Sequence, residues 1–538
     1  MCQLFEETSV VRFKRNKSVL VSLSFVAIIA VGLFLRCSQL GFLHDDEYSR
    51  MMAIVFIDKT MFSGSYRNLL GFPSFHWLIR YLAYKFAELI DPIGTSRLAS
   101  YSYNLDMSWS QYLSQYGQAY AISLKVPIFA MDIIGAAFLF RLIRRIIDDH
   151  RVQLIFVSWY FLNPALIIVE RGGDYTPIAT AFTLISLYYS VNGRPVKAAI
   201  FLALGTSTKL MPAILFAPIL VWFGKKGKEN VTFLLCFALT YVLTYTPFIV
   251  RNGFESLLLV HVSPPPYLLI SQLPSGYFGD FEYRFWIITD VLFGLRTDFF
   301  AQEFTVWNPV IQSWHRVELI TLGIQYSVFI WITILSLKKR AWIKDQPNKF
   351  LSLISLSVII FYLLSMKMNY SYFYAFVLPL TVFVHPLQYV AFLIFGTGFS
   401  SVGFYLPDHP STYRIVLLLG RFLIPSLMLL KGIQRAYAGK FDIFNWKTVL
   451  FSGIIFTNYF FVFGIPILIP SLTLHIWGLA AFGWLLSGLM ILAFKRELNS
   501  THAIDLRFYQ FPRLKLFVLS EIFVISVFIA KLFYYLNV

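Results

Sequence analysis

Residues 12–35 read RFKRNKSVLVSLSFVAIIAVGLFL, in which a basic segment precedes an apolar run that begins at Ser18. The run is about as long as a helix that crosses the hydrocarbon core of a bilayer. A basic flank before the first span places the N-terminus in the cytoplasm by the positive-inside rule. Because no small-residue cleavage site follows the run, we expect an uncleaved anchor that emerges on the non-cytoplasmic side near Arg36.

Similar apolar runs recur along the 538-residue chain, and the composition is that of a membrane protein. Hydrophobic residues make up 58% of the chain and charged residues only 14%, whereas soluble domains average about 45–50% and about 25%. This composition excludes a soluble enzyme and an intrinsically disordered chain. The formal charge of +17 is explained by basic cytoplasmic loops that face anionic lipid headgroups, and no nucleic-acid-binding motif competes with that interpretation.

Apolar runs and charged flanks alternate in a way that predicts how the chain crosses the membrane. The expected spans after the first are 119–140, 153–169, 176–191, 198–223, 231–249, 319–337 and 350–366. Lys209 and Pro212 interrupt the run 198–223, so we expect two short helices in a hairpin with Lys209 near its external tip. Together with further runs near the C-terminal end, this pattern predicts an all-α polytopic membrane protein with about 13–15 transmembrane helices.

Two less apolar segments, 36–119 and 250–314, are expected to be long external loops. Within the first, a span over 72–90 would place Arg80, Lys85 and Glu88 in the hydrocarbon. An ionised side chain in lipid is energetically expensive, so we expect an interfacial helix in this loop.

His44, Asp45, Asp46 and Glu47 form an acidic stretch a few residues beyond the first expected span. Because neighbouring carboxylates repel each other, one of them is expected to hold a proton more readily, which suits a general base. A hard divalent cation bound by the same oxygens is one alternative, and a solvated acidic turn is the plain structural one. Beside a membrane cavity lined by other ionisable residues, the functional interpretation is favoured.

Glu170 and Asp174 form a second acidic pair at the external end of an expected span. Between them, Gly172 and Gly173 permit a tight turn that brings the backbone close to a ligand. An ordinary glycine-rich loop with helix-capping side chains explains the same residues equally well.

Three basic residues near the expected external boundary are candidates for binding a phosphate, namely Lys209, Arg251 and Lys367. Lysine in lipid is expensive, so Lys209 should face a cavity or a charged partner. For each of the three, a side chain that extends toward the membrane interface is the structural alternative.

Several short motifs follow one another along residues 18–385. They are Asp45-Asp46-Glu47, Phe72-Pro73-Ser74-Phe75, Lys125-Val126-Pro127 with Asp132, Asn163-Pro164 with Gly173-Asp174, Ser207-Thr208-Lys209-Leu210-Met211-Pro212, Trp307-Asn308 and Lys367-Met368-Asn369-Tyr370. In order and spacing they resemble the GT-C superfamily of membrane glycosyltransferases, in the branch that includes GPI mannosyltransferases and the lumenal glucosyltransferases of N-glycan assembly. Two departures leave the sugar and the lipid-binding residues open: no Gln or His precedes the acidic position at 174, and the Lys367 stretch lacks a His-Glu-Lys.

The resemblance implies a GT-C-like catalytic module over residues 1–385, with additional transmembrane helices over 386–538. It implies transfer of a hexose, mannose or glucose, from a polyprenyl- or dolichyl-phosphate donor to a hydroxyl of a glycolipid, a lipid-linked oligosaccharide or a protein. Transfer would occur with inversion on the lumenal or external face of the ER membrane or of a prokaryotic plasma membrane. Whether Mg²⁺ or Mn²⁺ takes part is left open.

The resemblance also suggests roles for the candidate residues. Asp45 or Asp46 would be the general base, with Glu47 orienting the base or the acceptor. Asp174, with His44 and Glu170, would support the acceptor or the base. The donor phosphate would be bound by Lys209, Arg251 and Lys367.

Two other classes of function fit parts of the sequence. A secondary transporter or lipid flippase also has intramembrane charges and broken helices, and it predicts inverted repeats and no covalent change in its substrate. A non-catalytic scaffold of a membrane complex is the third interpretation, and it predicts that the Asp45 stretch tolerates substitution.

Overall fold

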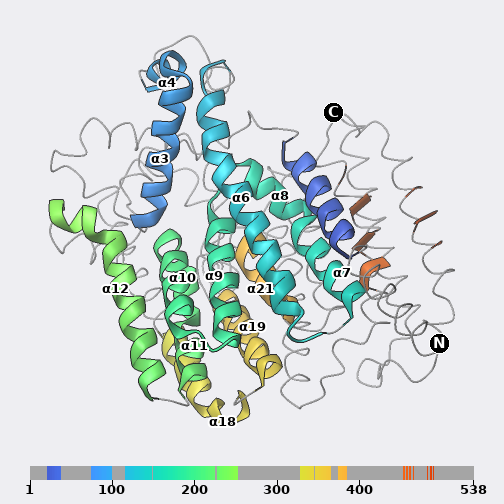
Figure 1. Ribbon diagram of the computed structural model, residues 1–538, viewed down its shortest axis with the longest axis vertical. Helices are drawn as coiled ribbons and strands as arrows, with labels where there is room; N and C mark the ends of the chain where they lie inside the picture. Colours follow the sequence, from blue (N-terminus) through green and yellow to red (C-terminus); the bar gives the residue numbers. More distant parts are fainter. Residues whose placement is uncertain are drawn as a thin grey trace, which may run out of the picture.

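The computed structural model describes residues 21–37, 74–99, 115–147, 149–224, 227–252, 327–343, 346–364 and 373–383, with isolated residues between 452 and 489. In this part of the chain all regular structure is helical (Figure 1). This agrees with the predicted all-α class, and the total of about 13–15 spans stays a prediction.

The first half of the described chain contains most of the long helices. In chain order they are the helix Val21–Cys37, α3 (Ser74–Ile90), α4 (Pro92–Ala99), α6 (Gln118–Ile143), α7 (His150–Phe161), α8 (Pro164–Arg171), α9 (Thr176–Val191), α10 (Pro195–Thr208), the 3-10 helix η2 (Met211–Leu215), α11 (Phe216–Phe223) and α12 (Gly227–Asn252). They are followed by the helix Ser327–Lys338, α18 (Arg340–Ile343), α19 (Pro347–Leu364), the π-helical turn η4 (Phe373–Val377), α21 (Leu378–Leu380) and η5 (Thr381–Phe383).

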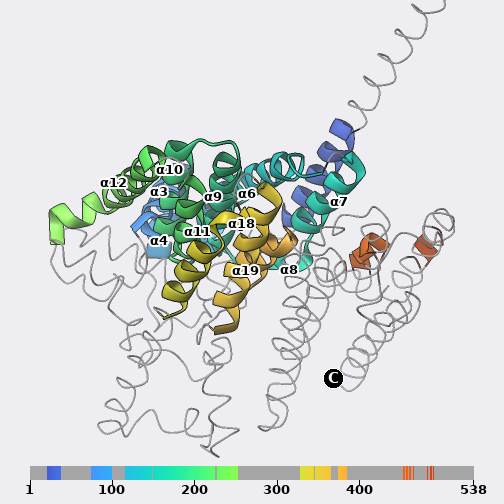
Figure 2. The ribbon, with the colours of Figure 1, turned by 90° about the horizontal axis from the view of Figure 1, so that it is seen from below.

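Two of these helices, Gln118–Ile143 and Gly227–Pro247, are long and apolar enough to cross a membrane. The outward surface of α12 shows what surrounds it, because Val231, Leu235, Leu239 and Leu243 recur every four residues and are all more than half exposed. Such a stripe is unfavourable in water and fits contact with lipid or with another membrane helix. In both views α12 lies at one edge of the described bundle, and Val21–Cys37 with α7 lies at the other (Figures 1 and 2).

Helix α9 occupies the centre of the bundle and follows the predicted range 176–191. It packs against α6 and against α10, which in turn packs against α12 (Figure 1). Small side chains permit this approach: a Cβ added at Gly205 would lie 3.3 Å from the carbonyl oxygen of Ala179. A hydrogen bond of 2.7 Å from Ser186 Oγ to the carbonyl oxygen of Ala198 joins the same two helices. Small residues and interhelical hydrogen bonds are typical of helix packing within membranes.

The expected span 153–169 is not one continuous helix, because two helices occupy it, and whether the segment crosses the membrane stays a prediction. Helix α7 ends at Phe161 and α8 begins at Pro164. Proline lacks the N–H that would continue the ladder of α7, and it disfavours a helical conformation for Asn163 before it. The same proline suits the first position of a new helix.

The predicted interruption of 198–223 is confirmed. Helix α10 ends at Thr208, and Lys209 is extended, with φ −146° and ψ 137°. The chain then turns through η2 into α11. Near the end of α11, Trp222 Nε1 donates a hydrogen bond of 2.8 Å to the carbonyl oxygen of Ser190, near the end of α9. The hairpin therefore returns to the side from which α10 starts.

Helix α3 falls where an interfacial helix is expected, and polar residues lie on its buried side while apolar residues are exposed on the other. His76 and Arg80 are fully buried, whereas Leu82, Phe86 and Leu89 are more than half exposed. The helix packs against α6, α10 and α12. Arg80 therefore lies within the protein and away from lipid, which removes the cost expected for an arginine in hydrocarbon.

Candidate functional site

The turn between α8 and α9 forms the centre of the candidate site. Gly173 has a φ of 86°, in the left-handed region that glycine adopts without strain. Directly after it, Asp174 Oδ1 accepts hydrogen bonds from the backbone N–H of Thr176 at 2.7 Å and from the Thr176 hydroxyl at 2.6 Å. These bonds satisfy donors at the start of α9, so Asp174 fixes the direction in which this helix begins.

Lys209 approaches this turn from the break between α10 and η2. Its Nζ lies 3.7 Å from Asp174 Oδ1, and the exposed fractions of the two side chains are 5% and 15%. The two residues are 35 positions apart in the sequence, and the packing of α9 against α10 brings them together. The turn is thus held by one buried cation and one carboxylate with limited access to solvent.

Hydroxyl groups from three helices gather beside Lys209. Ser207 Oγ lies 2.8 Å from Thr244 Oγ1 on α12, and Ser74 Oγ at the start of α3 donates to the same Thr244 oxygen at 3.2 Å. On either side of Thr244 in α12, the hydroxyls of Tyr241 and Tyr245 lie 3.2 Å apart. Polar groups from α3, α10 and α12 therefore meet at the end of α10 that carries Lys209.

Helix α3 adds a basic and an aromatic contact to the same turn. The Arg80 guanidinium lies 4.3 Å from the centre of the Tyr175 ring, which is the geometry of a cation–π interaction. Arg80 Nε donates to His76 Nε2 at 3.0 Å, and the His76 ring meets the Tyr175 ring edge to face at 5.3 Å. Tyr175 follows Asp174 directly, so α3 and α10 hold the turn from two sides.

A second charged cluster lies next to the turn and is fully buried. Arg36, near the end of Val21–Cys37, forms ion pairs with Asp132 on α6 and with Glu170 on α8, and all three side chains are 0% exposed. Arg36 Nη1 also donates to the carbonyl oxygens of Phe161 at 2.8 Å and Gly32 at 3.1 Å. Its guanidinium lies 4.0 Å from the centre of the Phe161 ring.

Arg171 extends this cluster back to the first helix, since its Nε donates to the carbonyl oxygen of Leu35 at 3.1 Å. Arg36 thus pairs with both carboxylates, whereas Arg171 is bound to a backbone carbonyl. A buried charge is tolerated when it is paired and hydrogen-bonded in this way. The cluster fixes Val21–Cys37 against α6, α7 and α8. Its last member in the sequence, Arg171, lies three residues before Asp174.

The predicted site residues fare differently in the structure. Asp174 and Lys209 are brought together as an ion pair. Glu170 is buried against Arg36, so it cannot touch an acceptor. Of the two roles expected for it, burial permits only indirect support of the base. Arg251 lies on α12, and its side chain is outside the described part. His44, Asp45, Asp46, Glu47 and Lys367 lie outside the described residues.

Sequence reasoning missed the roles of Arg36 and Arg80. As the residue that follows an apolar run, Arg36 is explained by the membrane interface, and no signal near it in the sequence indicates a buried partner. Arg80 counted only as a cost against a membrane span. Within the described ranges no group of three or more His, Cys, Asp or Glu residues is placed to hold a metal ion, and the 44–47 stretch lies outside those ranges.

A comparison with known families finds a match to part of the chain. Residues 101–261 match the family described as GPI transamidase subunit PIG-U, which corresponds to less than a third of the 538-residue chain. The matched range contains α6 to α12 with Asp132, Glu170, Asp174 and Lys209, and excludes Arg36. No curated protein matches the chain. The matched family is thus a subunit of a GPI transamidase and is not described as a glycosyltransferase.

Proposed function

We propose that this chain is a multi-pass subunit of a GPI transamidase-type complex in the ER membrane, built on a GT-C-like helical bundle. The observation that carries the proposal is the family match over 101–261, the segment that forms the centre of the described bundle. Of the functions that the sequence leaves open, the scaffold of a membrane complex is the one that agrees best with this match.

The contacts of the acidic residues in the matched segment support a non-catalytic role. Asp132 and Glu170 are paired with a buried arginine, and Asp174 is engaged both with Lys209 and with the start of α9. A general base must reach the proton that it abstracts, and a carboxylate buried in an ion pair does not. These three carboxylates instead join helices to one another.

The outward surfaces of α3 and α12 suit a protein that works among other membrane helices. Both carry apolar residues that are more than half exposed, such as Leu82 on α3 and Leu239 on α12. Faces of this kind contact lipid or the helices of neighbouring subunits.

Depletion and rescue test this proposal. Loss of the chain should reduce the amount of a GPI-anchored reporter protein at the cell surface, and wild type should restore it. A variant that combines Asp45→Asn, Asp46→Asn and Glu47→Gln should restore it as well. Rescue by wild type and not by this variant would contradict a non-catalytic role.

A hexosyltransferase is the second candidate function, and the order of the GT-C-like motifs favours it, with Lys209 placed at the break between α10 and η2. In that reaction the acceptor hydroxyl oxygen would attack the anomeric carbon, and its proton would pass to Asp45 or Asp46. The bond between the anomeric carbon and the phosphate oxygen would break, releasing the polyprenyl phosphate near Lys209.

Radiolabelled dolichyl-phosphate mannose and dolichyl-phosphate glucose would test this second candidate directly. Transfer of label into a lipid extract by the purified chain, lost in Asp45→Asn or Asp46→Asn, would establish the transferase. Absence of a labelled product with either donor, with and without Mg²⁺ or Mn²⁺, would leave the subunit role as the better account.

A further inference from the structure

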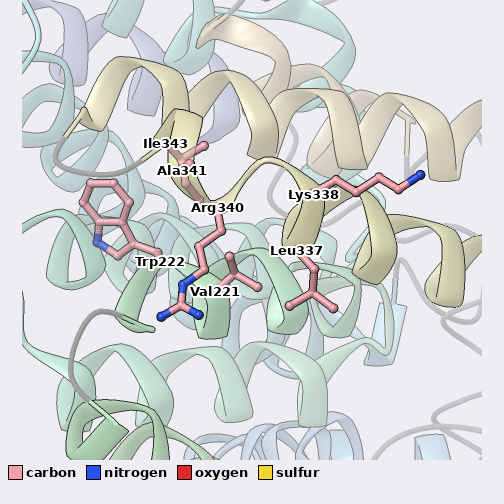
Figure 3. A pocket seen from close by; sticks show the side chains of 7 residues that line it. All are labelled: Val221, Trp222, Leu337, Lys338, Arg340, Ala341 and Ile343. Atoms are coloured by element: carbon pink, nitrogen blue, oxygen red, sulfur yellow. The ribbon is translucent and has the colours of Figure 1, made fainter.

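A cavity of about 440 Å³ lies between the end of α11 and the segment that joins Ser327–Lys338 to α18. Two cationic residues, Lys338 and Arg340, line it together with apolar side chains that include Val221, Trp222 and Ile343 (Figure 3). Among the lining residues that the structure describes, none is acidic. We propose that this cavity binds the phosphate group of an anionic membrane lipid. The inference does not depend on the proposed subunit role.

Arg340 is the expected anchor for the phosphate. One of its N–H groups donates to the carbonyl oxygen of Gly224, which ties α18 to the end of α11. Guanidinium carries five N–H donors in a planar fork that matches phosphate oxygens, so further donors remain for a ligand. The Arg340 side chain points toward α11 and away from the Lys338 ammonium (Figure 3).

Lys338 supplies a second positive charge. The structure gives it no carboxylate partner within the described ranges, and its side chain is exposed. Its flexible four-carbon stem allows the ammonium to turn toward a phosphate bound at Arg340. Two cations in the described lining, and no acidic residue among its described members, favour an anionic ligand.

The opposite wall of the cavity is apolar and fixed in position. The Trp222 ring stacks on Phe350 with 4.5 Å between ring centres, and its Nε1 is hydrogen-bonded to Ser190. Val221 and Ile343 are buried beside it. An apolar wall beside a cationic end matches a lipid, which joins a charged headgroup to hydrocarbon chains, better than a small soluble phosphate.

The position of the cavity agrees with this ligand. Lys225, Lys226 and Lys228 follow α11 in the sequence, and Lys338, Lys339 and Arg340 follow one another at the second wall. The positive-inside rule places both segments on the cytoplasmic side. Anionic lipids are enriched in that leaflet, and basic pockets between membrane helices on that side bind their headgroups.

Titration of the purified full chain in detergent with phosphatidylserine and with phosphatidylcholine, read by native mass spectrometry, tests the proposal. Wild type should prefer phosphatidylserine. Lys338→Gln and Arg340→Gln should each weaken its binding about fivefold, the effect of losing about 1 kcal/mol per basic residue. The control is Arg145→Gln, an exposed basic residue in the turn after α6, which should leave binding unchanged.

Three results would overturn the proposal: equal binding of both lipids, an equal loss in all three variants, or displacement of phosphatidylserine by inorganic phosphate at a similar concentration. The last result would assign the cavity to a soluble phosphate. Because Arg340 also bonds to Gly224, its variant is judged only if its melting temperature matches that of wild type. If that melting temperature is lower, Arg340→Lys is tested in its place. This variant keeps the positive charge but lacks the planar guanidinium, and it should bind phosphatidylserine more weakly than wild type.

Discussion

Replacing Arg36 by glutamine is expected to destabilise the helical bundle strongly. The substitution would leave the carboxylates of Asp132 and Glu170 buried without their cation, and would also remove the hydrogen bonds to the carbonyl oxygens of Gly32 and Phe161. Removing one partner of a buried ion pair costs about 3–5 kcal/mol. Arg36 serves two carboxylates at once, so the upper half of this range is expected for the free energy of unfolding.

Thermal unfolding of the purified full chain in a mild detergent would measure the effect. One kcal/mol shifts the melting temperature by about 2–4 °C in a domain of about 150–250 residues and by less in a larger one, so a loss of about 4 kcal/mol should lower it by several degrees. The matched control is Arg151→Gln, because Arg151 also pairs with an aspartate, but its side chain is 59% exposed. Exposed pairs contribute about 0–1 kcal/mol, so this variant should melt close to wild type.

A double-mutant cycle with Glu170→Gln separates the ion pair from general damage. Contacting charged residues show a coupling energy of about 0.5–3 kcal/mol, so the double variant should be more stable than the sum of the two single losses predicts. Equal melting temperatures for Arg36→Gln and Arg151→Gln, or strict additivity with Glu170→Gln, would refute the argument that Arg36 holds these helices together.

Three further substitutions, two of them with a control variant, test the helix contacts around the candidate site, each by thermal unfolding. Asp174→Ala removes the hydrogen bonds to the start of α9 and the partner of Lys209, and should cost about 1–2 kcal/mol, whereas Asp174→Asn keeps an acceptor oxygen and should lose less. Gly205→Leu must displace α9 and should cost about 1–3 kcal/mol, while Gly227→Ala enters open space and should be neutral. Gly173→Ala places a Cβ on a residue with a φ of 86° and should cost about 1–2 kcal/mol.

Local sequence was sufficient to predict the elements of the fold whose limits are set by nearby residues. The range of α9 and the break at Lys209 follow from apolar runs and from residues that interrupt them. The break before Pro164 is not visible in the hydropathy, because apolar residues continue through it and only the missing N–H of a single proline marks it.

The partners in the candidate site were harder to predict, because they come from distant parts of the chain. The pairing of Arg36 with Glu170 joins residues 134 positions apart. The sequence around each of the two residues does not indicate that the other is its partner. The sequence did indicate that Lys209 needs a partner, because a lysine between apolar helices is expensive in lipid. That the partner is Asp174 depends on how α9 and α10 pack.

The most direct test of the central proposal is purification of the tagged full chain from its native membranes in a mild detergent, followed by quantitative mass spectrometry of the proteins that remain bound. A subunit of a GPI transamidase-type complex should retain the other transamidase subunits in constant proportion through a sizing column. Recovery of the chain without them, as a separate species that transfers sugar from a dolichyl-phosphate donor, would contradict the proposal.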